Sequence, residues 1–428
     1  MNSKTNRLFS VFLGLFCAAK LIAAEPPAQQ YLHFALEACD HAEDQIPEIT
    51  RVAGIVADRY IQGGLIGFAY TYCRGQGLDN ELWGRSGQIV HVGFERPWKS
   101  ERTEAEKTND VVITGWTRAP NPGNLELLQE FKKRKCFLIG FGPRELPALA
   151  EQVKLCDAWF DTGYGSDDHA VKLPDGSFAG HGNLLSQTIS AWSLMGEVIA
   201  ACTRRGKMPV IAKSFSYEDG FEWWTRYFEK KQFHDDLKVD PIKPGVMARA
   251  YIDKIRGYIK KYERTQLPSV NRAADLIVEE VAEGRKIALP TMGHMAWFFA
   301  GREEGSVWAM EPMDVAGEQP QSVDLYLEKT PDKALALHLA YSGQFKTDQA
   351  YLKKKQQRVI LITSENPRPE WKLPDDLLTR IDTGWEFGDA AVSIPGYPIR
   401  ALPPSGVMQL IAYETVNVEV LSRLAAAK

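Results

Sequence analysis

Several features that would assign this sequence to a well-marked class of protein are scarce or missing. Only six cysteines and eight histidines occur in 428 residues, and neither set shows metal-ligand spacing or a disulfide framework. Lysine and arginine form no basic cluster and the net charge is −4, which argues against a nucleic acid as partner because binding phosphates requires concentrated positive charge. We therefore expect no metal and no cofactor. A small molecule or a protein is the more plausible partner.

The first 24 residues differ from the rest of the chain. A positively charged start precedes an almost wholly apolar run, and the sequence turns polar after Ala24. Lys20 interrupts the run at about the length of a signal-peptide core, whereas a membrane span needs about 20 apolar residues. We predict a signal peptide over residues 1–24, a secreted or periplasmic protein, and no stable membrane span after cleavage.

Length and an internal repeat both indicate two domains. A chain of 428 residues exceeds what one hydrophobic core usually organises. The segment DTGYGSDDHAVKLP, which begins at Asp161, recurs as DTGWEFGDAAVSIP at Asp382, an offset of 221 residues. Half of the fourteen positions are identical. We infer that the chain contains two copies of one structural unit.

The repeat extends beyond this segment. Residues 49–70 match residues 270–291, and in each an amphipathic helix leads into a buried strand. Continuous apolar strands that alternate with helices are typical of a parallel sheet covered on both faces. The predicted fold class is α/β, with two tandem domains, each a parallel sheet flanked by helices. The predicted divisions are a first domain over 25–215, an aromatic-rich inter-domain segment over 216–245 that packs across the interface, and a second domain over 246–428.

Three stretches of the second copy resemble the sugar isomerase (SIS) domain family. They read AADLIVEEVAEGRKIALPTMGH, LAYSGQFKTDQAYLKKKQQRVILITS and GDAAVSIPGYPIRALPPSGVMQL. The resemblance covers about residues 28–215 and 245–428. It implies two flavodoxin-like (SIS-type) domains packed about a pseudo-twofold axis, and a ligand near the carboxyl ends of the strands.

The turns that follow the predicted strands hold the candidate ligand-binding residues. At the carboxyl edge of a doubly wound sheet, backbone N–H groups and helix amino ends point outwards, and serine and threonine hydroxyls can complete a cradle for phosphate. The predicted ligand-binding residues are Thr71, Thr114, Gly115, Thr117, Thr291, Gly293, Ser342, Gly343, Thr363 and Ser364.

Aldose–ketose isomerisation needs a base and an acid, roles that the resemblance gives to a glutamate and a histidine. The candidate catalytic residues are His294, Glu365 and Glu419. Glu419 and its counterpart Glu197 lie inside apolar helices, where burial raises the pKa of a carboxyl group and suits it to act as a base. The alternative is a glutamate that pairs with an arginine or a backbone donor.

Other polar residues have a structural interpretation beside the functional one. Asp168 and Asp389 recur in both copies, which favours a role in the fold, such as capping a turn. Further loop candidates for the site are His169, His181 and Glu386. In the inter-domain segment, the Trp223–Trp224 pair is expected to pack and the cluster around His234 to form a solvated turn.

Three hypotheses for the function remain open. The leading one is an exported SIS-domain protein that binds a sugar or sugar phosphate, with isomerase activity undecided. The alternative is a non-catalytic periplasmic sugar-binding or regulatory module, because the serine-rich turn typical of active family members is depleted at residues 113–117 and 340–345. A two-lobed solute-binding protein fits less well, since its chain passes repeatedly between lobes. A homodimer is also left open.

Overall fold

The computed structural model describes most of the chain. Residues 1–24, which hold the predicted signal peptide, lie outside the described set. No described helix is long and apolar enough to span a membrane. The described residues are 25–68, 78–82, 84–89, 102–117, 122–164, 168–228, 231–285, 287–288, 307–309, 333, 335–339, 356, 358–364 and 378–427.

The first sheet is parallel, and its described strands follow the order β1-β2-β3-β4. Successive residues of β2 alternate between two cores, with Val111 and Ile113 on one face and Val112 on the other. Both faces are therefore covered, which explains why these strands are continuously apolar. The elements are β1 (Ile66–Phe68), β2 (Val111–Gly115), β3 (Phe137–Gly142), β4 (Ala158–Asp161), with helices α2 (Ile46–Ile61) and α7 (Asn183–Arg204) on one face and α5 (Pro122–Lys133) and α6 (Ala150–Leu155) on the other.

The second sheet is also parallel, with the order β11-β10-β9-β7-β8. This is the flavodoxin-like order, in which the second strand along the chain lies outside the first. The elements are β7 (Ile287–Ala288), β8 (Trp308–Ala309), β9 (Leu335–Leu339), β10 (Arg358–Thr363) and β11 (Leu378–Asp382), packed by α9 (Val246–Ala282) and α13 (Ser405–Ala426). The predicted α/β class, with parallel sheets flanked by helices, is confirmed.

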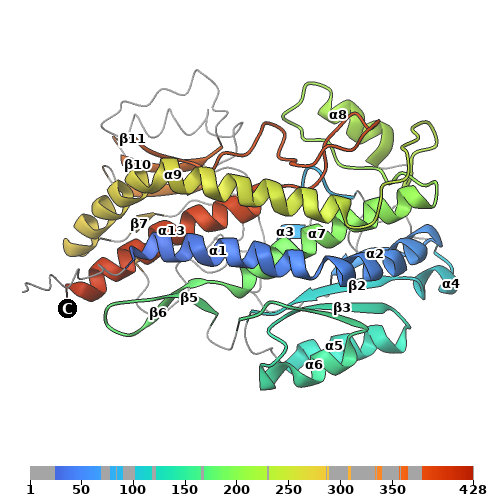
Figure 1. Cartoon of the computed structure of the whole chain (residues 1–428), viewed down its shortest axis with the longest axis horizontal. Coiled ribbons are helices and arrows are strands. Elements are labelled where there is room, and N and C mark those ends of the chain that lie inside the picture. Colours follow the sequence, from blue (N-terminus) through green and yellow to red (C-terminus); the bar gives the residue numbers. More distant parts are fainter. Residues whose placement is uncertain are drawn as a thin grey trace, which may run out of the picture.

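Four long helices lie side by side between the two sheets (Figure 1). They are α1 (Pro27–Asp44), α7, α9 and α13. Both α7 and α13 are buried along nearly their whole length, as expected for the two long apolar helices of the repeat. Pro268 lies inside the continuous helix α9, whereas in the first half the chain breaks at Gln45, just before Pro47, into α1 and α2.

The segment between α7 and α9 packs against both halves of the chain. The backbone N–H of Ala212 donates to Gln88, and the N–H of Ile211 donates to the Tyr397 hydroxyl at 3.2 Å. His234 lies 2.9 Å from the same hydroxyl and is buried, so the expectation of a solvated turn at this histidine is wrong. The Trp223 indole donates to Ile211 O at 3.0 Å and packs among aromatic rings, in agreement with its predicted packing role.

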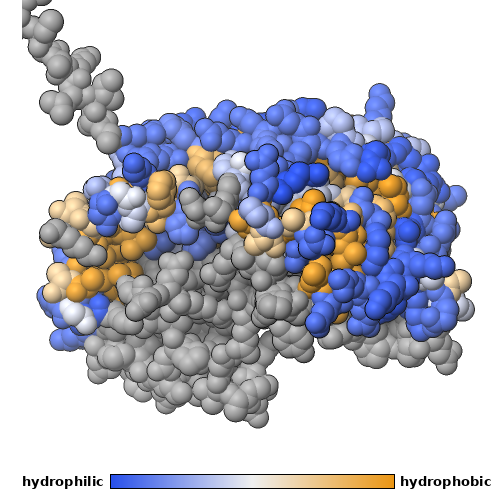
Figure 2. All heavy atoms as spheres, turned by 90° about the horizontal axis from the view of Figure 1, so that it is seen from below, coloured by the Kyte–Doolittle hydropathy of each residue, from blue (hydrophilic) through white to orange (hydrophobic). Residues whose placement is uncertain are grey.

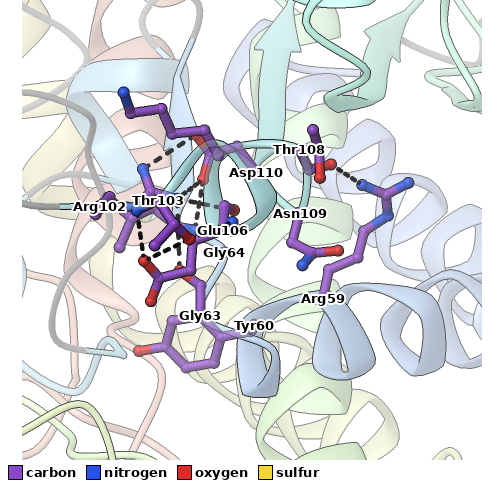
Figure 3. A network of polar contacts seen from close by, with 12 residues as sticks. Arg59, Tyr60, Gly63, Gly64, Arg102, Thr103, Glu106, Thr108, Asn109 and Asp110 are labelled. Atoms are coloured by element: carbon purple, nitrogen blue, oxygen red, sulfur yellow. Dashed lines mark hydrogen bonds and ion pairs between the residues drawn. The ribbon is translucent and has the colours of Figure 1, made fainter.

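A buried ion pair fastens the amino edge of the first sheet (Figure 3). The Asp110 carboxylate accepts from the backbone N–H of Leu65 at 2.8 Å and pairs with the guanidinium of Arg102. Arg102 also donates to Gly63 O and Glu106 O, at 3.4 Å and 3.1 Å. The residues just before β1 and β2 are therefore tied together at the edge opposite the strand ends that were predicted to bind a ligand.

The surface seen in Figure 2 is mostly hydrophilic where it is described, with apolar side chains gathered in a few areas. Large hydrophobic side chains that remain exposed include Phe178, Phe215, Phe221 and Phe387. Two of them, Phe215 and Phe221, lie on the segment between α7 and α9. Exposed apolar side chains that gather in one area mark contact surfaces for ligands or partners.

Candidate functional site

Six of the thirteen predicted site residues fall within the described part of the chain. They are Thr114, Gly115, Thr117, Thr363, Ser364 and Glu419. The others lie outside the described residues, and their roles stay predictions: Thr71, Thr291, Gly293, His294, Ser342, Gly343 and Glu365.

The end of β2 divides its predicted residues between the two faces of the sheet. A Cβ atom on Gly115 would lie 2.3 Å from Oε1 of Gln187 and 2.7 Å from Leu78, so only glycine fits against α7. Thr114 is the preceding residue, and strand alternation turns its side chain to the α5 and α6 face. Its hydroxyl is buried and has no partner among the described residues. Gly115 and Thr114 therefore do not form a single cradle.

The amino end of α7 lies at the carboxyl edge of the first sheet and gathers three loops. The Asn183 amide donates to Thr117 O at 3.2 Å, and the Thr162 hydroxyl donates to the Asn183 oxygen at 2.5 Å. The backbone N–H of Asn183 donates to the Asp168 carboxylate at 2.5 Å. Residues after β2, after β4 and before α7 thus converge on one buried asparagine, which the repeat alone did not single out.

One turn along α7, the side chain of Gln187 stands out. It is fully buried, and within the described part of the chain neither its amide nitrogen nor its amide oxygen has a hydrogen-bond partner. Buried polar groups are nearly always paired, by protein or by a bound molecule. Gln187 was not among the predicted site residues. The available signal was a glutamine within a helix whose other residues are mostly apolar or small.

Asp168 caps α7 within a buried cluster of titratable groups. His181 Nδ1 lies 2.5 Å from Glu414 Oε1, and the Asn417 amide donates to the other Glu414 oxygen at 3.2 Å. Burial raises the pKa of Asp168 to about 7, an effect that His181 opposes and Glu414 reinforces. Asp168 has a role in the fold, as expected. Glu414 was missed, although it is a carboxylate in the middle of an apolar helix.

The second half has a corresponding cap with different neighbours. Asp389 accepts from the N–H and the hydroxyl of Ser405, at 3.1 Å and 2.7 Å, and burial raises the pKa of Asp389 to about 6. Near it, the Glu81 carboxylate pairs with Arg85 at 2.8 Å and accepts from the Trp192 indole at 3.1 Å. Asp168 caps α7 and Asp389 caps α13 in the same way, whereas the polar groups around the two aspartates differ. This supports a role of the repeated aspartates in the scaffold.

The repeated DTG motif builds the turn after the last strand of each sheet. Asp161 accepts from the N–H of Gly163, and Asp382 accepts from the N–H of Gly384, each at 3.2 Å. Both glycines have a φ of +77°, in the left-handed region that favours glycine. The motif is therefore explained by backbone geometry and needs no catalytic role.

The described ligand candidates of the second half belong to the end of β10. Thr363 O accepts from the N–H of Thr383 at 2.8 Å, and Ser364 O accepts from Arg380 at 3.1 Å. The Thr363 hydroxyl is buried and has no partner among the described residues. Their role in binding stays a prediction.

Glu419 and Glu197 each cap a helix of the opposite half. Glu419 accepts from the N–H of Ala28, at the start of α1, at 3.0 Å. Glu197 accepts from the N–H groups of Met247 and Ala248, at the start of α9, both at 3.1 Å. A carboxylate at a helix amino end satisfies unpaired donors and interacts favourably with the helix dipole. This is the backbone pairing that was the alternative to catalysis.

Replacing Glu419 with glutamine separates the two roles. The amide oxygen can still accept from Ala28, so Glu419→Gln is expected to lower the free energy of unfolding by only about 1 kcal/mol. If the Glu419 carboxylate is catalytic, Glu419→Gln should abolish turnover of the protein while the fold stays intact. Urea denaturation together with an assay of ketose formation measures both effects. If the variant unfolds like Glu419→Ala, the glutamine cannot replace the cap.

No group of three or more histidine, cysteine, aspartate or glutamate side chains that could hold a metal ion occurs among the described residues. Cys39, Cys136, Cys156 and Cys202 are free thiols. Burial raises the pKa of Cys39, Cys156 and Cys202 to about 12, which disfavours the reactive thiolate form.

Comparison with known proteins finds solved structures of similar fold. No family model and no curated protein sequence match the chain. Among solved structures, a candidate tagatose-6-phosphate ketose/aldose isomerase from Clostridium novyi NT is similar to it, with 9% identity, a TM-score of 0.51, and coverage of 93% of this chain and 88% of that one.

Two further solved structures match with lower scores. The C-terminal domain of glucosamine-fructose-6-phosphate aminotransferase from Francisella tularensis has 10% identity and a TM-score of 0.49, over 91% of this chain and 96% of that one. A candidate phosphosugar isomerase from Clostridium difficile 630 has 9% identity and a TM-score of 0.48, over 93% of both chains. At such low identity the likeness concerns the fold alone. The Clostridium novyi structure, whose score is highest of the three, shows that this α/β fold extends over most of the chain.

Proposed function

We propose that the chain is an exported sugar-binding protein with two SIS-type domains in tandem, and that it binds a sugar or sugar phosphate at the carboxyl edge of the first sheet. The observation that carries the proposal is the buried Gln187 amide, which lies against Gly115 without a partner among the described residues. An unpaired buried polar group costs free energy, and sugar hydroxyls offer both donors and acceptors to satisfy it.

Both the fold and the sequence support a sugar or sugar phosphate as the ligand. The structural neighbour from Clostridium novyi NT is a candidate isomerase of a phosphorylated sugar, and fold likeness raises the expectation of a related ligand without assigning it. The internal repeat, with the SIS resemblance of its second copy, supports the proposed tandem arrangement, and the apolar run of residues 8–24 supports the proposed export.

A neutral sugar is favoured over a sugar phosphate at this edge. Helix amino ends commonly bind phosphate, but the first N–H of α7 already donates to the Asp168 carboxyl group. Because burial raises the pKa of Asp168 to about 7, a phosphate there would face a group that is partly ionised at neutral pH. A sugar hydroxyl meets no such repulsion.

Binding without catalysis is the better supported form of this function. Glu419, one of the candidate catalytic residues, is occupied as the cap of α1, and the serine-rich turn of active family members is depleted at residues 113–117 and 340–345. The test is to incubate pure protein with glucose, galactose, fructose, glucose 6-phosphate and fructose 6-phosphate while following Tm and aldose–ketose interconversion. A rise in Tm with a neutral sugar and no conversion is expected. Conversion would establish an isomerase, and the absence of any Tm change would contradict binding.

Replacing Gln187 with leucine is expected to separate binding from stability. The unpaired amide disappears and volume is nearly kept, so the free energy of unfolding should stay the same or rise by up to about 1 kcal/mol. The affinity for the sugar found in the panel should fall about tenfold or more. Calorimetric titration and urea denaturation measure the two quantities.

Ser193→Ala in the same helix is the matched control. The Ser193 hydroxyl is buried but already donates to Ile189 O at 2.8 Å within α7, so its loss should leave sugar affinity unchanged. Unchanged affinity in Gln187→Leu as well would remove Gln187 from the binding site.

A further inference from the structure

A pocket of about 430 Å³ lies between the segment that precedes α8 (Gly220–Trp223) and the loop that follows β11. Figure 1 shows these two parts of the chain next to each other near the α8 label. The volume of the pocket is within the range of small-molecule sites, about 300 to 1,000 Å³. The lining residues are Lys213, Tyr217, Glu386, Phe387, Pro398, Ile399 and Arg400. The pocket is therefore built from both halves of the chain and does not involve the amino end of α7.

Two aromatic rings form an ordered, partly exposed wall. The Tyr217 and Phe387 ring centroids are 5.1 Å apart in an edge-to-face arrangement, and the Tyr217 hydroxyl donates to Phe387 O at 3.3 Å. The two residues are nevertheless 36% and 37% exposed. Rings that are held in place but left open to solvent offer apolar faces to a ligand at little further cost in entropy.

The polar groups of the pocket come as ion pairs. Lys213 is 13% exposed, lies 2.5 Å from the Asp219 carboxylate, and has its Nζ atom 5.2 Å from the Tyr217 ring centroid. Glu386 pairs with Arg400, and its other oxygen pairs with Lys254 at 3.2 Å. Each cation faces a carboxylate, so the pocket offers several donors and acceptors without a surplus of one charge.

We propose that this pocket binds a neutral saccharide. The apolar C–H face of a sugar ring packs on Tyr217 and Phe387, while its hydroxyls accept from Lys213 and donate to Glu386. A small anion is disfavoured because it would have to displace a carboxylate from each cation. This inference rests on the pocket and not on the proposed function, whose site lies at α7.

The same segment offers aromatic surface beyond the pocket. Phe215 and Phe221 are 61% and 69% exposed, and the Phe215 ring lies 5.0 Å from that of Trp224. Sugar units that extend from the pocket along this segment would find further rings. An oligosaccharide is therefore expected to bind more tightly than its single sugar unit.

The test uses the full mature chain, calorimetric titration, and glucose, maltotriose, cellotriose and chitotriose as probes. Tyr217→Ala is expected to weaken binding of the best trisaccharide about tenfold, the effect of losing one ring contact. Glu386→Gln should weaken it too and tests the site without removing a ring. Phe178→Ala is the matched control because this phenylalanine is 49% exposed on β6 (Phe178–His181), and it should leave affinity unchanged.

The outcomes separate this site from the one at α7. Gln187→Leu should leave trisaccharide binding at this pocket intact, and Tyr217→Ala should leave binding at α7 intact. The proposal is overturned if no probe binds at millimolar concentration, if both pocket variants bind like the unmodified chain, or if glucose 6-phosphate binds here more tightly than glucose.

Discussion

Replacing Asp110 with alanine is expected to lower the free energy of unfolding by about 3–5 kcal/mol, measured by urea denaturation. The carboxylate is fully buried and accepts from the Leu65 N–H at 2.8 Å while it pairs with Arg102. Its removal leaves a buried guanidinium without its partner and a strand-end N–H without its acceptor. Both are costly because water cannot replace the lost contacts.

A second variant distinguishes the unpaired charge from the loss of packing. In Asp110→Asn/Arg102→Met no charge remains buried, and the asparagine oxygen can still accept from Leu65. The double variant is therefore expected to be more stable than Asp110→Ala. If the double variant is as unstable as Asp110→Ala, the unpaired charge of Arg102 is not the cause of the lower stability.

The exposed pair of Glu104 with Lys107 is the matched control. It lies on the neighbouring helix α4 (Glu104–Lys107), and the Glu104 side chain is 87% exposed. Exposed pairs are screened by water and contribute little to stability, so Glu104→Gln should unfold like the unmodified chain.

The elements of the fold could be predicted largely because their signals are local. Apolar runs such as 111–115, 137–142 and 358–363 are strands, and the repeat correctly pairs the two long buried helices. Periodicity alone does not determine the order β11-β10-β9-β7-β8, whereas the SIS resemblance implied a flavodoxin-like domain, a fold that has this strand order. The continuous helix over 246–282 was not predicted, and it contains Pro268, a residue that usually ends or kinks a helix.

The candidate site was harder to predict because its contacts are long-range. Thr114 and Gly115 are neighbours in the sequence, yet strand alternation sends them to opposite faces. Asn183 and Gln187 were not predicted as site residues, and only the packing of α7 on the sheet shows them at its carboxyl edge. His181 meets Glu414 across 233 residues of sequence, a distance that no local pattern encodes.

The reciprocal caps show how the two halves depend on each other. The Tyr31 hydroxyl donates to His181 O at 2.8 Å, and the Tyr251 hydroxyl donates to Pro403 O at 3.0 Å, so α1 and α9 make equivalent contacts. Glu419 caps α1 and Glu197 caps α9, each from the helix of the other half. We expect neither α1 nor α9 to keep its first helical turn without the carboxylate from the opposite half of the chain.

Replacing Glu197 with alanine tests this dependence and is expected to lower the free energy of unfolding by about 3 kcal/mol. Three backbone N–H groups, those of Gly245, Met247 and Ala248, lose their acceptor at a buried helix end. Urea denaturation measures the loss. Hydrogen exchange should show that the amides of residues 246–249 exchange faster, because the first turn of α9 is no longer held.

The residues at which amide exchange becomes faster decide which helix end each carboxylate holds. Glu419→Ala should speed exchange at residues 27–30 and not at 246–249, because its carboxylate caps α1. Glu279→Ala, at an exposed position of α9, should change neither region. If Glu197→Ala loosens the chain uniformly, the carboxylate supports the whole interface and not one helix end. Fraying confined to α9 would instead mean that each half holds the first turn of one long helix of the other half, α1 or α9.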